Sequence, residues 1–253
     1  MDFAVLVDTG LSRPAGYAEA HAAMVTLRAK TGVCEITRAG ELRFIGDTDG
    51  LDACLNSVGS AKITTLSMTS GGGDVAKALP VARRVAALKL KLKIIGVCAS
   101  SCANYIVPVA STIEIMPYSI IALHGGMDKR FLSTAEAQLR ASLAASDPAP
   151  SPEETDMIVN SELSKLKDLL DDQEKFKDEY GVSSDWFELK AYKNFEMKDG
   201  SGKTPMVAVS ESFFKKNLNV KLSNSSWWMK NQTDYNLVSS LFEKSFIIYD
   251  GNP

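Results

Sequence analysis

Histidine is the scarcest of the residues that commonly carry catalytic chemistry, since the 253-residue chain contains only two, His21 and His124. The chain also lacks an apolar run of the roughly eighteen or more residues that a membrane-spanning helix requires. Its formal net charge is -3, with 28 Lys and Arg against 31 Asp and Glu, so no excess of positive charge indicates a nucleic acid or an anionic membrane as partner. With only two histidines, few positions could supply a histidine base to a catalytic site.

Cysteine is also scarce, but its number is even. Cys34, Cys54, Cys98 and Cys102 permit two disulfides, and their neighbourhood in the sequence favours Cys34 with Cys54 and Cys98 with Cys102. The alternative is four buried thiols in a cytosolic protein. No further cysteines or histidines follow at the spacing of a zinc site, so no structural metal is expected.

Cysteine pairing also bears on the cellular compartment. The first residues, MDFAVLVDTG, lack a basic segment followed by an apolar stretch, so no signal peptide is expected within them. If the disulfides form, we expect an exported protein, periplasmic once a signal peptide has been removed; otherwise we expect a cytoplasmic one.

The predicted elements indicate an α/β fold with largely parallel strands, because strands and helices alternate after an initial helix and hairpin. We expect the helix at 14–30, the hairpin at 33–45, strands at 63–68, 93–97, 112–116 and 120–123, and helices at 47–57, 73–88, 102–109, 133–144, 152–179, 209–218 and 237–248. The length suits a single domain over residues 1–253, with a helical excursion at 133–180 and a C-terminal extension at 221–253. The excursion contains an amphipathic helix with leucines on one face. We favour a role for this face in an oligomer contact over the alternative of a solvated helix.

Two of the predicted strands end in residues suited to a catalytic site. Three glycines, Gly71–Gly73, follow the strand at 63–68, and without Cβ atoms their N–H groups can point at an anion. A tight turn would use the same residues. Ser101 follows the strand at 93–97 and precedes a helix, so its hydroxyl is expected at the carboxyl edge of the sheet, where sites lie in parallel folds. A helix cap is the alternative for this serine.

Three segments together resemble a known family: Ser-Gly-Gly-Gly-Asp-Val at 70–75, Cys-Ala-Ser-Ser-Cys-Ala at 98–103 and Ile-Ala-Leu-His-Gly-Gly at 121–126. They are similar to the Clp-type peptidase and signal-peptide-peptidase superfamily, closest to its bacterial periplasmic ClpP-like branch. The resemblance implies a ClpP/crotonase-like superhelix of repeated β-β-α units. It also implies that the excursion at 133–180 is handle-like and that the protein forms homo-oligomers.

The resemblance also implies roles for individual residues. Ser101 corresponds to the nucleophile, His124 to the base and Gly73 to an oxyanion-hole glycine, while the amide of Cys102 would be the second oxyanion donor.

The third catalytic residue departs from the family pattern. Its expected position falls near Lys190, which is not an acid. Glu188 and Asp199 are neighbouring acids, and Lys190 itself raises the possibility of a Ser–Lys mechanism.

The sequence therefore predicts a serine peptidase that cleaves peptides or unfolded proteins without a cofactor. Because the acid position is unmatched, a catalytically degenerate ClpP-like binding or scaffold protein is the alternative. A third reading is a crotonase-type acyl-CoA enzyme, which would share the glycine-loop oxyanion site but would need no serine–histidine pair.

Overall fold

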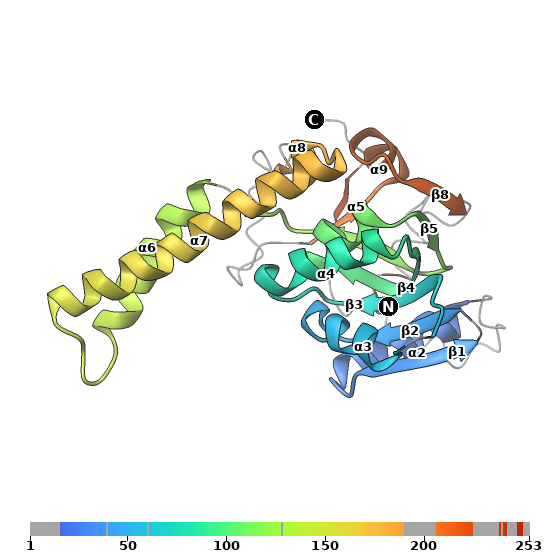
Figure 1. Ribbon diagram of the computed structural model, residues 1–253, viewed down its shortest axis with the longest axis horizontal. Coiled ribbons are helices and arrows are strands. Elements are labelled where there is room, and N and C mark those ends of the chain that lie inside the picture. The colour runs from blue at the N-terminus through green and yellow to red at the C-terminus, as the bar shows by residue number, and fades with distance from the viewer. Residues whose placement is uncertain are drawn as a thin grey trace.

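The computed structural model describes residues 16–38, 40–59, 61–127, 129–189 and 206–224, together with 238, 240, 241 and 247–249. In chain order the elements are α2 (Tyr17–Arg28), β1 (Val33–Arg38), β2 (Glu41–Ile45), η1 (Thr48–Gly50), α3 (Leu51–Ser57), β3 (Thr65–Ser70), α4 (Val75–Ala87), β4 (Lys91–Ala99), η2 (Cys102–Ile106), α5 (Val107–Val109), β5 (Thr112–Ile115), β6 (Ile120–Leu123), α6 (Lys129–Ala144), α7 (Pro152–Tyr180), α8 (Ser184–Glu188), β7 (Val207–Val209), α9 (Glu211–Asn217), β8 (Lys221–Asn224) and β9 (Ile247–Tyr249). Figure 1 shows a sheet-containing body from which the α6 and α7 helices project.

The strands form one mixed sheet in the order β1-β2-β3-β4-β6-β7-β9, with β5 pairing with β4 and with β8. Most neighbouring strands are parallel; β1 with β2 and β6 with β7 are antiparallel. The predicted α/β fold with largely parallel strands is therefore confirmed, as is the predicted hairpin near residue 40. A superhelix of repeated β-β-α units stays a prediction.

The sheet divides along its central strand, β4. The first half of β4 pairs with β5, from Lys91 to Ile94, whereas the last residues, Val97 to Ala99, pair with β6. Gly96 lies between the two halves with φ 72°, a left-handed conformation that glycine adopts without strain. A Cβ at this position would also come within 3.2 Å of the Met24 sulfur. The division brings the carboxyl end of β4 beside that of β6.

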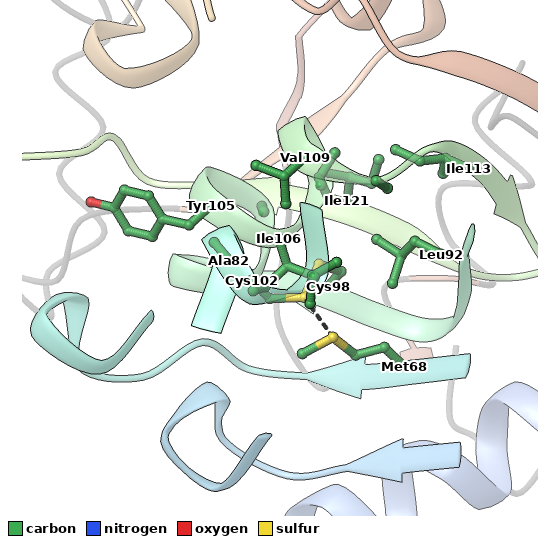
Figure 2. Close-up of a cluster of buried hydrophobic side chains, with 14 of the residues drawn as sticks. Met68, Ala82, Leu92, Cys98, Cys102, Tyr105, Ile106, Val109, Ile113 and Ile121 are labelled. Carbon is green, nitrogen blue, oxygen red and sulfur yellow. Dashed lines mark hydrogen bonds between the residues drawn. A yellow bond between two sulfur atoms is a disulfide. The ribbon is translucent and has the colours of Figure 1, made fainter. Parts of the chain in front are cut away.

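Side chains of β4 alternate between two buried clusters. Ile94 and Cys98 face a large cluster that includes residues of α4, η2 and α5, and Val97 and Ala99 face a smaller cluster against α2. In the large cluster the disulfide of Cys98 and Cys102 lies against Met68, as Figure 2 shows. A nine-residue strand that is buried on both faces accounts for the near-continuous apolar pattern of this segment.

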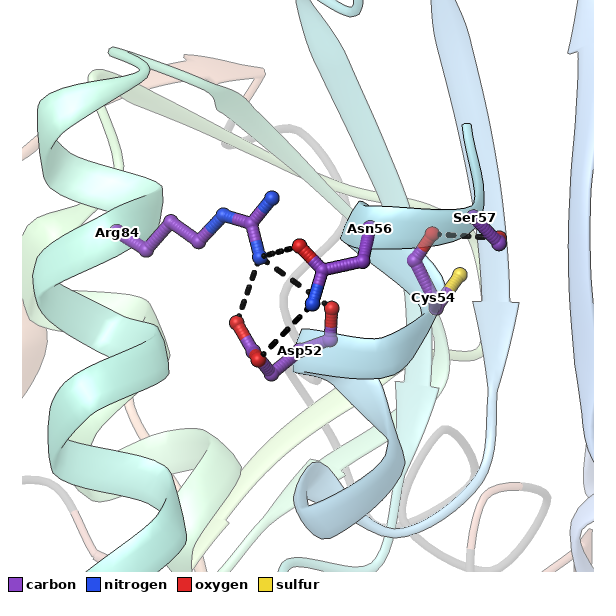
Figure 3. A network of polar contacts seen from close by, with 5 residues as sticks. All are labelled: Asp52, Cys54, Asn56, Ser57 and Arg84. Carbon is purple, nitrogen blue, oxygen red and sulfur yellow. Dashed lines mark hydrogen bonds and ion pairs between the residues drawn. The ribbon is translucent and has the colours of Figure 1, made fainter. Parts of the chain in front are cut away.

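Helix α4, which follows the glycine loop (Gly71–Gly73), is tied to α3 by a polar network. One guanidinium nitrogen of Arg84 donates to Asp52 Oδ1 at 2.6 Å and to Asn56 Oδ1 at 2.8 Å, and Asn56 in turn donates to Asp52 (Figure 3). Ser57 Oγ donates to the Cys54 carbonyl at 2.8 Å at the end of the same helix. The contacts of Arg84 hold α3, the helix that follows β2, against α4, the helix that follows β3.

The α6–α7 hairpin is attached to the body near the C-terminal end of α7. Arg83 of α4 binds Asp172 through two hydrogen bonds of 2.8 and 3.0 Å and reaches Glu179 at 3.2 Å. A capping box at Ser151 begins α7, and Gly181 ends it at φ 62°. Helices thus occupy the segment where the sequence predicts an excursion, although its role in oligomers stays a prediction.

One predicted element differs at its C-terminal end. The sequence predicts a helix at 237–248, whereas Ile247–Tyr249 form strand β9, which pairs in parallel with β7. A short apolar run with β-branched residues fits a buried strand as well as a helix, so its periodicity does not distinguish the two. Across the described part of the chain, the structure contains no helix whose length and apolar character would suit a membrane crossing.

Candidate active site

Both cysteine pairs predicted from the sequence are confirmed. The sulfur atoms of Cys34 and Cys54 lie 2.09 Å apart, and those of Cys98 and Cys102 lie 1.97 Å apart. The second pair brackets the turn that carries the two adjacent serines, which we call the serine turn (residues 98–102).

Ser100 occupies the strained position of the serine turn. It directly follows β4 and has φ 52°, an uncommon conformation for a residue with a side chain. Its N–H donates to the Ala122 carbonyl at 3.0 Å, and its carbonyl accepts from the Asn104 N–H at 2.8 Å. Backbone hydrogen bonds on both sides of Ser100 therefore hold the turn. Residues with a positive φ, as at Ser100, cluster at functional sites.

Ser100, and not Ser101, is the serine that contacts His124. Ser100 Oγ lies 2.6 Å from His124 Nε2, which is hydrogen-bond distance. Ser101 is only 2% exposed, and its hydroxyl donates to the Gly73 carbonyl at 2.6 Å. The structure thus does not bring together the pair predicted from the family pattern. The physical reason is the left-handed φ at Ser100, which turns its side chain toward β6 and leaves Ser101 directed at the glycine loop.

The glycine loop packs directly against Ser100. Gly72 has φ 107°, and a Cβ built on it would lie 2.6 Å from the Ser100 Cβ and 3.0 Å from its Oγ. No other residue type fits this approach without displacing the serine. By contrast, a Cβ on Gly71 would meet no atom within 4 Å.

The Gly73 N–H is directed by the hydrogen bond of the preceding carbonyl. Gly72 O accepts from the Thr48 N–H at 2.8 Å. In a trans peptide the carbonyl and the following N–H point in opposite directions, so the Gly73 N–H points away from Thr48. Asp49 fixes the next N–H, that of Asp74, at 2.7 Å from its Oδ1. Thr48 and Asp49 thus hold one side of the glycine loop, and the Gly73 N–H is directed to the opposite side.

Further donors lie at the start of η2. The first N–H groups of a helix have no partner within the helix, and Ser101 and Cys102 occupy these positions. The Cys102 amide, predicted as an oxyanion donor, follows Ser101, whereas the amide that directly follows Ser100 is that of Ser101. Anions are favoured at such a helix start.

His124 directly follows β6 and faces Ser100 from the neighbouring strand. Its pKa is lowered from the ordinary histidine value, because the surrounding protein desolvates the charged ring even though the side chain retains contact with solvent. A hydrogen bond to its own backbone acts in the opposite direction. A lowered pKa keeps the imidazole neutral near pH 7, the form in which it can accept a proton.

The third catalytic residue is not located. Within the described ranges no carboxylate forms a hydrogen bond or ion pair with His124. Glu188, the last residue of α8, is exposed and makes no such contact. Lys190 and Asp199, the other two candidates, lie outside the described residues.

The other histidine plays no part in this arrangement. His21 lies on α2 and its ring stacks on Tyr17 with centroids 6.1 Å apart. Among the residues that the structure describes, no group of three or more His, Cys, Asp or Glu side chains could hold a metal ion.

Comparison with known proteins adds little to this geometry. No protein-family model matches the chain, and no curated protein matches it. One solved structure that resembles the chain is an enoyl-CoA hydratase from Mycobacterium avium subsp. paratuberculosis K-10. The two share 10% identity with a TM-score of 0.32, over 58% of this chain and 87% of the hydratase. A likeness this slight carries no argument about activity.

Proposed function

We propose that the protein is a serine hydrolase that cleaves peptide bonds, with Ser100 as nucleophile and His124 as base. The observation that carries this proposal is the 2.6 Å contact between Ser100 Oγ and His124 Nε2 at the carboxyl ends of two adjacent strands. A nucleophile and base within hydrogen-bond reach are the signature of an activated serine. The proposal keeps the predicted base and moves the nucleophile by one residue.

In the proposed reaction, His124 Nε2 takes the hydroxyl proton as Ser100 Oγ attacks the peptide carbonyl carbon. The resulting tetrahedral oxyanion accepts hydrogen bonds from the N–H groups of Gly73 and Ser101. The imidazolium then gives its proton to the leaving amine, and the carbon–nitrogen bond breaks. Water, activated by the same imidazole, hydrolyses the acyl ester and restores the Ser100 hydroxyl.

The orientation of the histidine fits this role, since its Nε2 faces the Ser100 hydroxyl. Since Nε2 faces Ser100 at 2.6 Å, the mechanism requires the neutral tautomer that carries its proton on Nδ1. A proton on Nδ1 leaves Nε2 as the acceptor that the mechanism needs. A site without an orienting carboxylate would turn over more slowly, because such a group contributes orders of magnitude.

Ser101 has a different role in this proposal. Its buried hydroxyl holds the Gly73 carbonyl, so it is a positioning residue for the oxyanion loop and does not meet the substrate. Because the proposal gives Ser100 and Ser101 different roles, substituting each serine separately tests it directly.

The test is labelling with a fluorophosphonate probe, followed by mass spectrometry of the modified peptide. We expect label on Ser100, none in Ser100→Ala, and a loss on the order of 10³-fold or more in His124→Gln. Ser101→Ala is the matched control and should retain labelling at a rate roughly tenfold lower. Label that persists in Ser100→Ala but disappears in Ser101→Ala would restore the family assignment of Ser101.

Absence of labelling in the unmodified protein would overturn the proposed hydrolase. A peptide or unfolded protein that binds without being cleaved would then indicate the degenerate binding protein. Saturable binding of a CoA thioester would indicate the crotonase-type enzyme.

A further inference from the structure

The side chain of Gln173 binds the backbone just beyond the base. Gln173 lies on α7 and is 1% exposed. Its Nε2 donates to the Met127 carbonyl at 2.8 Å, and its Oε1 accepts from the Met127 N–H at 3.2 Å. The amide therefore pairs with both polar groups of one residue, as a neighbouring strand would.

The same amide reaches the helix that begins at the serine turn. Tyr105, which is fully buried in η2, donates its hydroxyl to Gln173 Oε1 at 2.8 Å. Burial raises the pKa of this phenol above its ordinary value, so it remains a donor. Gln173 thus contacts the nucleophile's helix on one side and the base's strand end on the other.

The residues between His124 and Met127 are both glycines, so side-chain packing cannot fix them. Gly125 has φ 94°, and a Cβ on Gly126 would lie 2.6 Å from the Phe187 ring and 2.9 Å from Gln173 Oε1. Hydrogen bonds from neighbouring elements hold the backbone of this segment, which we call the histidine segment (residues 124–127).

Two further bonds hold the histidine segment at its glycines. Asn104 Nδ2 donates to the Gly125 carbonyl at 3.1 Å, and the Gly126 N–H donates to the Phe187 carbonyl at 2.7 Å. These bonds come from η2 and α8. Gln173 alone among these partners lies on the helix that extends into the projecting hairpin (Figure 1).

We propose that Gln173 is a positioning residue that holds His124 at hydrogen-bond distance from Ser100, and that it couples the α6–α7 hairpin to the site. The inference rests on the proposed roles of Ser100 and His124. Its chemistry is specific to an amide, since a carboxylate could not donate to the Met127 carbonyl and an aliphatic side chain could do neither.

The test observes His124 directly, by ¹⁵N NMR of the imidazole, beside the rate of fluorophosphonate labelling. Because the chain has two histidines, a His21→Gln background leaves a single ring to assign. Ser100→Ala gives the reference spectrum for a broken Ser100–His124 contact. We expect Gln173→Leu to move the His124 Nε2 resonance toward that reference and to slow labelling at least about tenfold. Gln173→Glu, which keeps the acceptor and loses the donor, should fall between.

Two controls separate positioning from folding. Gln173→Leu combined with Tyr105→Phe removes the hydroxyl left unpaired in the single variant, so it should regain thermal stability without regaining labelling. Arg83→Met removes the ion pairs between α4 and α7 but contacts nothing in the histidine segment, so it should lower the melting temperature with labelling of the folded protein unchanged within about twofold.

The outcomes keep the two proposals distinct. If the unmodified protein does not label, the hydrolase is overturned, while the NMR comparison still tests whether Gln173 holds the ring. If the protein labels and Gln173→Leu changes neither the resonance nor the rate, the role of Gln173 is overturned. Equal losses in Arg83→Met and Gln173→Leu would also overturn it, since docking of α7 alone would then account for the effect.

Discussion

The two halves of the proposed site lie on neighbouring strands, yet they are supported by different forces. The serine turn is closed by the covalent bond of Cys98 and Cys102 and is packed into the main core (Figure 2). The histidine segment has no disulfide and contains two glycines, and its backbone is hydrogen-bonded to Asn104, to the Phe187 carbonyl and to Gln173. The serine turn is fixed by a covalent bond, whereas the histidine segment is fixed by hydrogen bonds that contribute about 1 kcal/mol each.

The difference indicates where the site can lose its geometry. Local opening follows the least protected backbone, and hydrogen bonds near solvent open before covalent closures do. We therefore expect the distance between Ser100 and His124 to vary mainly through movement of the histidine segment. Perturbing the serine side should require changes in covalent structure or direct steric conflict.

The largest expected effect comes from steric conflict at the serine turn. Gly72→Ala places a methyl group 2.6 Å from the Ser100 Cβ at φ 107°, so labelling should fall by about 10²-fold or more, with a loss of about 1–3 kcal/mol in the free energy of unfolding. Labelling rates and urea denaturation measure the two quantities. Gly71→Ala is the control, since its Cβ meets nothing within 4 Å, and both quantities should stay near those of the unmodified protein. Equal behaviour of the two variants would refute the close approach of the glycine loop.

The next effect isolates the covalent support of the serine turn by comparison with the other disulfide. Loop-closure entropy predicts a loss of about 3 kcal/mol for Cys34→Ala with Cys54→Ala, and about 2 kcal/mol for Cys98→Ala with Cys102→Ala, because the sequence separations are 20 and 4. Labelling should follow the opposite order. Only the second pair brackets Ser100, so only its removal should slow labelling, by roughly tenfold. Denaturation curves and labelling rates of the two double variants test the order, and slower labelling in the first pair would contradict it.

The smallest effect concerns pH and isolates the histidine side. Since the pKa of His124 is lowered, labelling should rise with pH through a midpoint below the usual value of about 6.5 and then level off, so the rate changes little near pH 7. Rate–pH profiles measure this midpoint. His124→Gln should give a flat, low profile, and a midpoint above 6.5 would contradict desolvation as the dominant influence.

The same shift predicts the sign of a stability effect. The unfolded chain, with the higher pKa, binds the proton more readily than the folded protein does, so the free energy of unfolding rises with pH. The contribution of His124 is present above pH 6.5 or so and is lost as pH falls through the lower folded-state pKa. Ser100→Ala keeps the histidine and should retain this dependence, which denaturation at several pH values measures.

Much of the fold could be predicted from the sequence, because its elements carry strong local signals. Alternating strand and helix patterns predicted the α/β order, and the spacing of the four cysteines predicted both disulfides. The helix predicted at 237–248 is wrong at its end, where Ile247–Tyr249 pair in parallel with β7 and the apolar pattern does not distinguish a strand from a helix.

The site was harder to predict, because it depends on a single backbone angle. Either of two adjacent serines could face the histidine, and the choice follows from φ 52° at Ser100, which the residue types around it do not specify. Gln173 gave no signal at all, since a glutamine on an amphipathic helix is ordinary. Its role depends on long-range packing that places α7 beside Met127.

The length of α7 gives the attachment at Gln173 a mechanical meaning. The helix begins at Pro152, about six turns before Gln173, so its far end lies roughly 30 Å from the amide at 1.5 Å per residue. A force on that end acts through a long lever arm, which meets the histidine segment at Gln173. A rotation about this attachment displaces the tip much further than it displaces Met127, because the tip lies roughly 30 Å away whereas Met127 is in direct contact with Gln173.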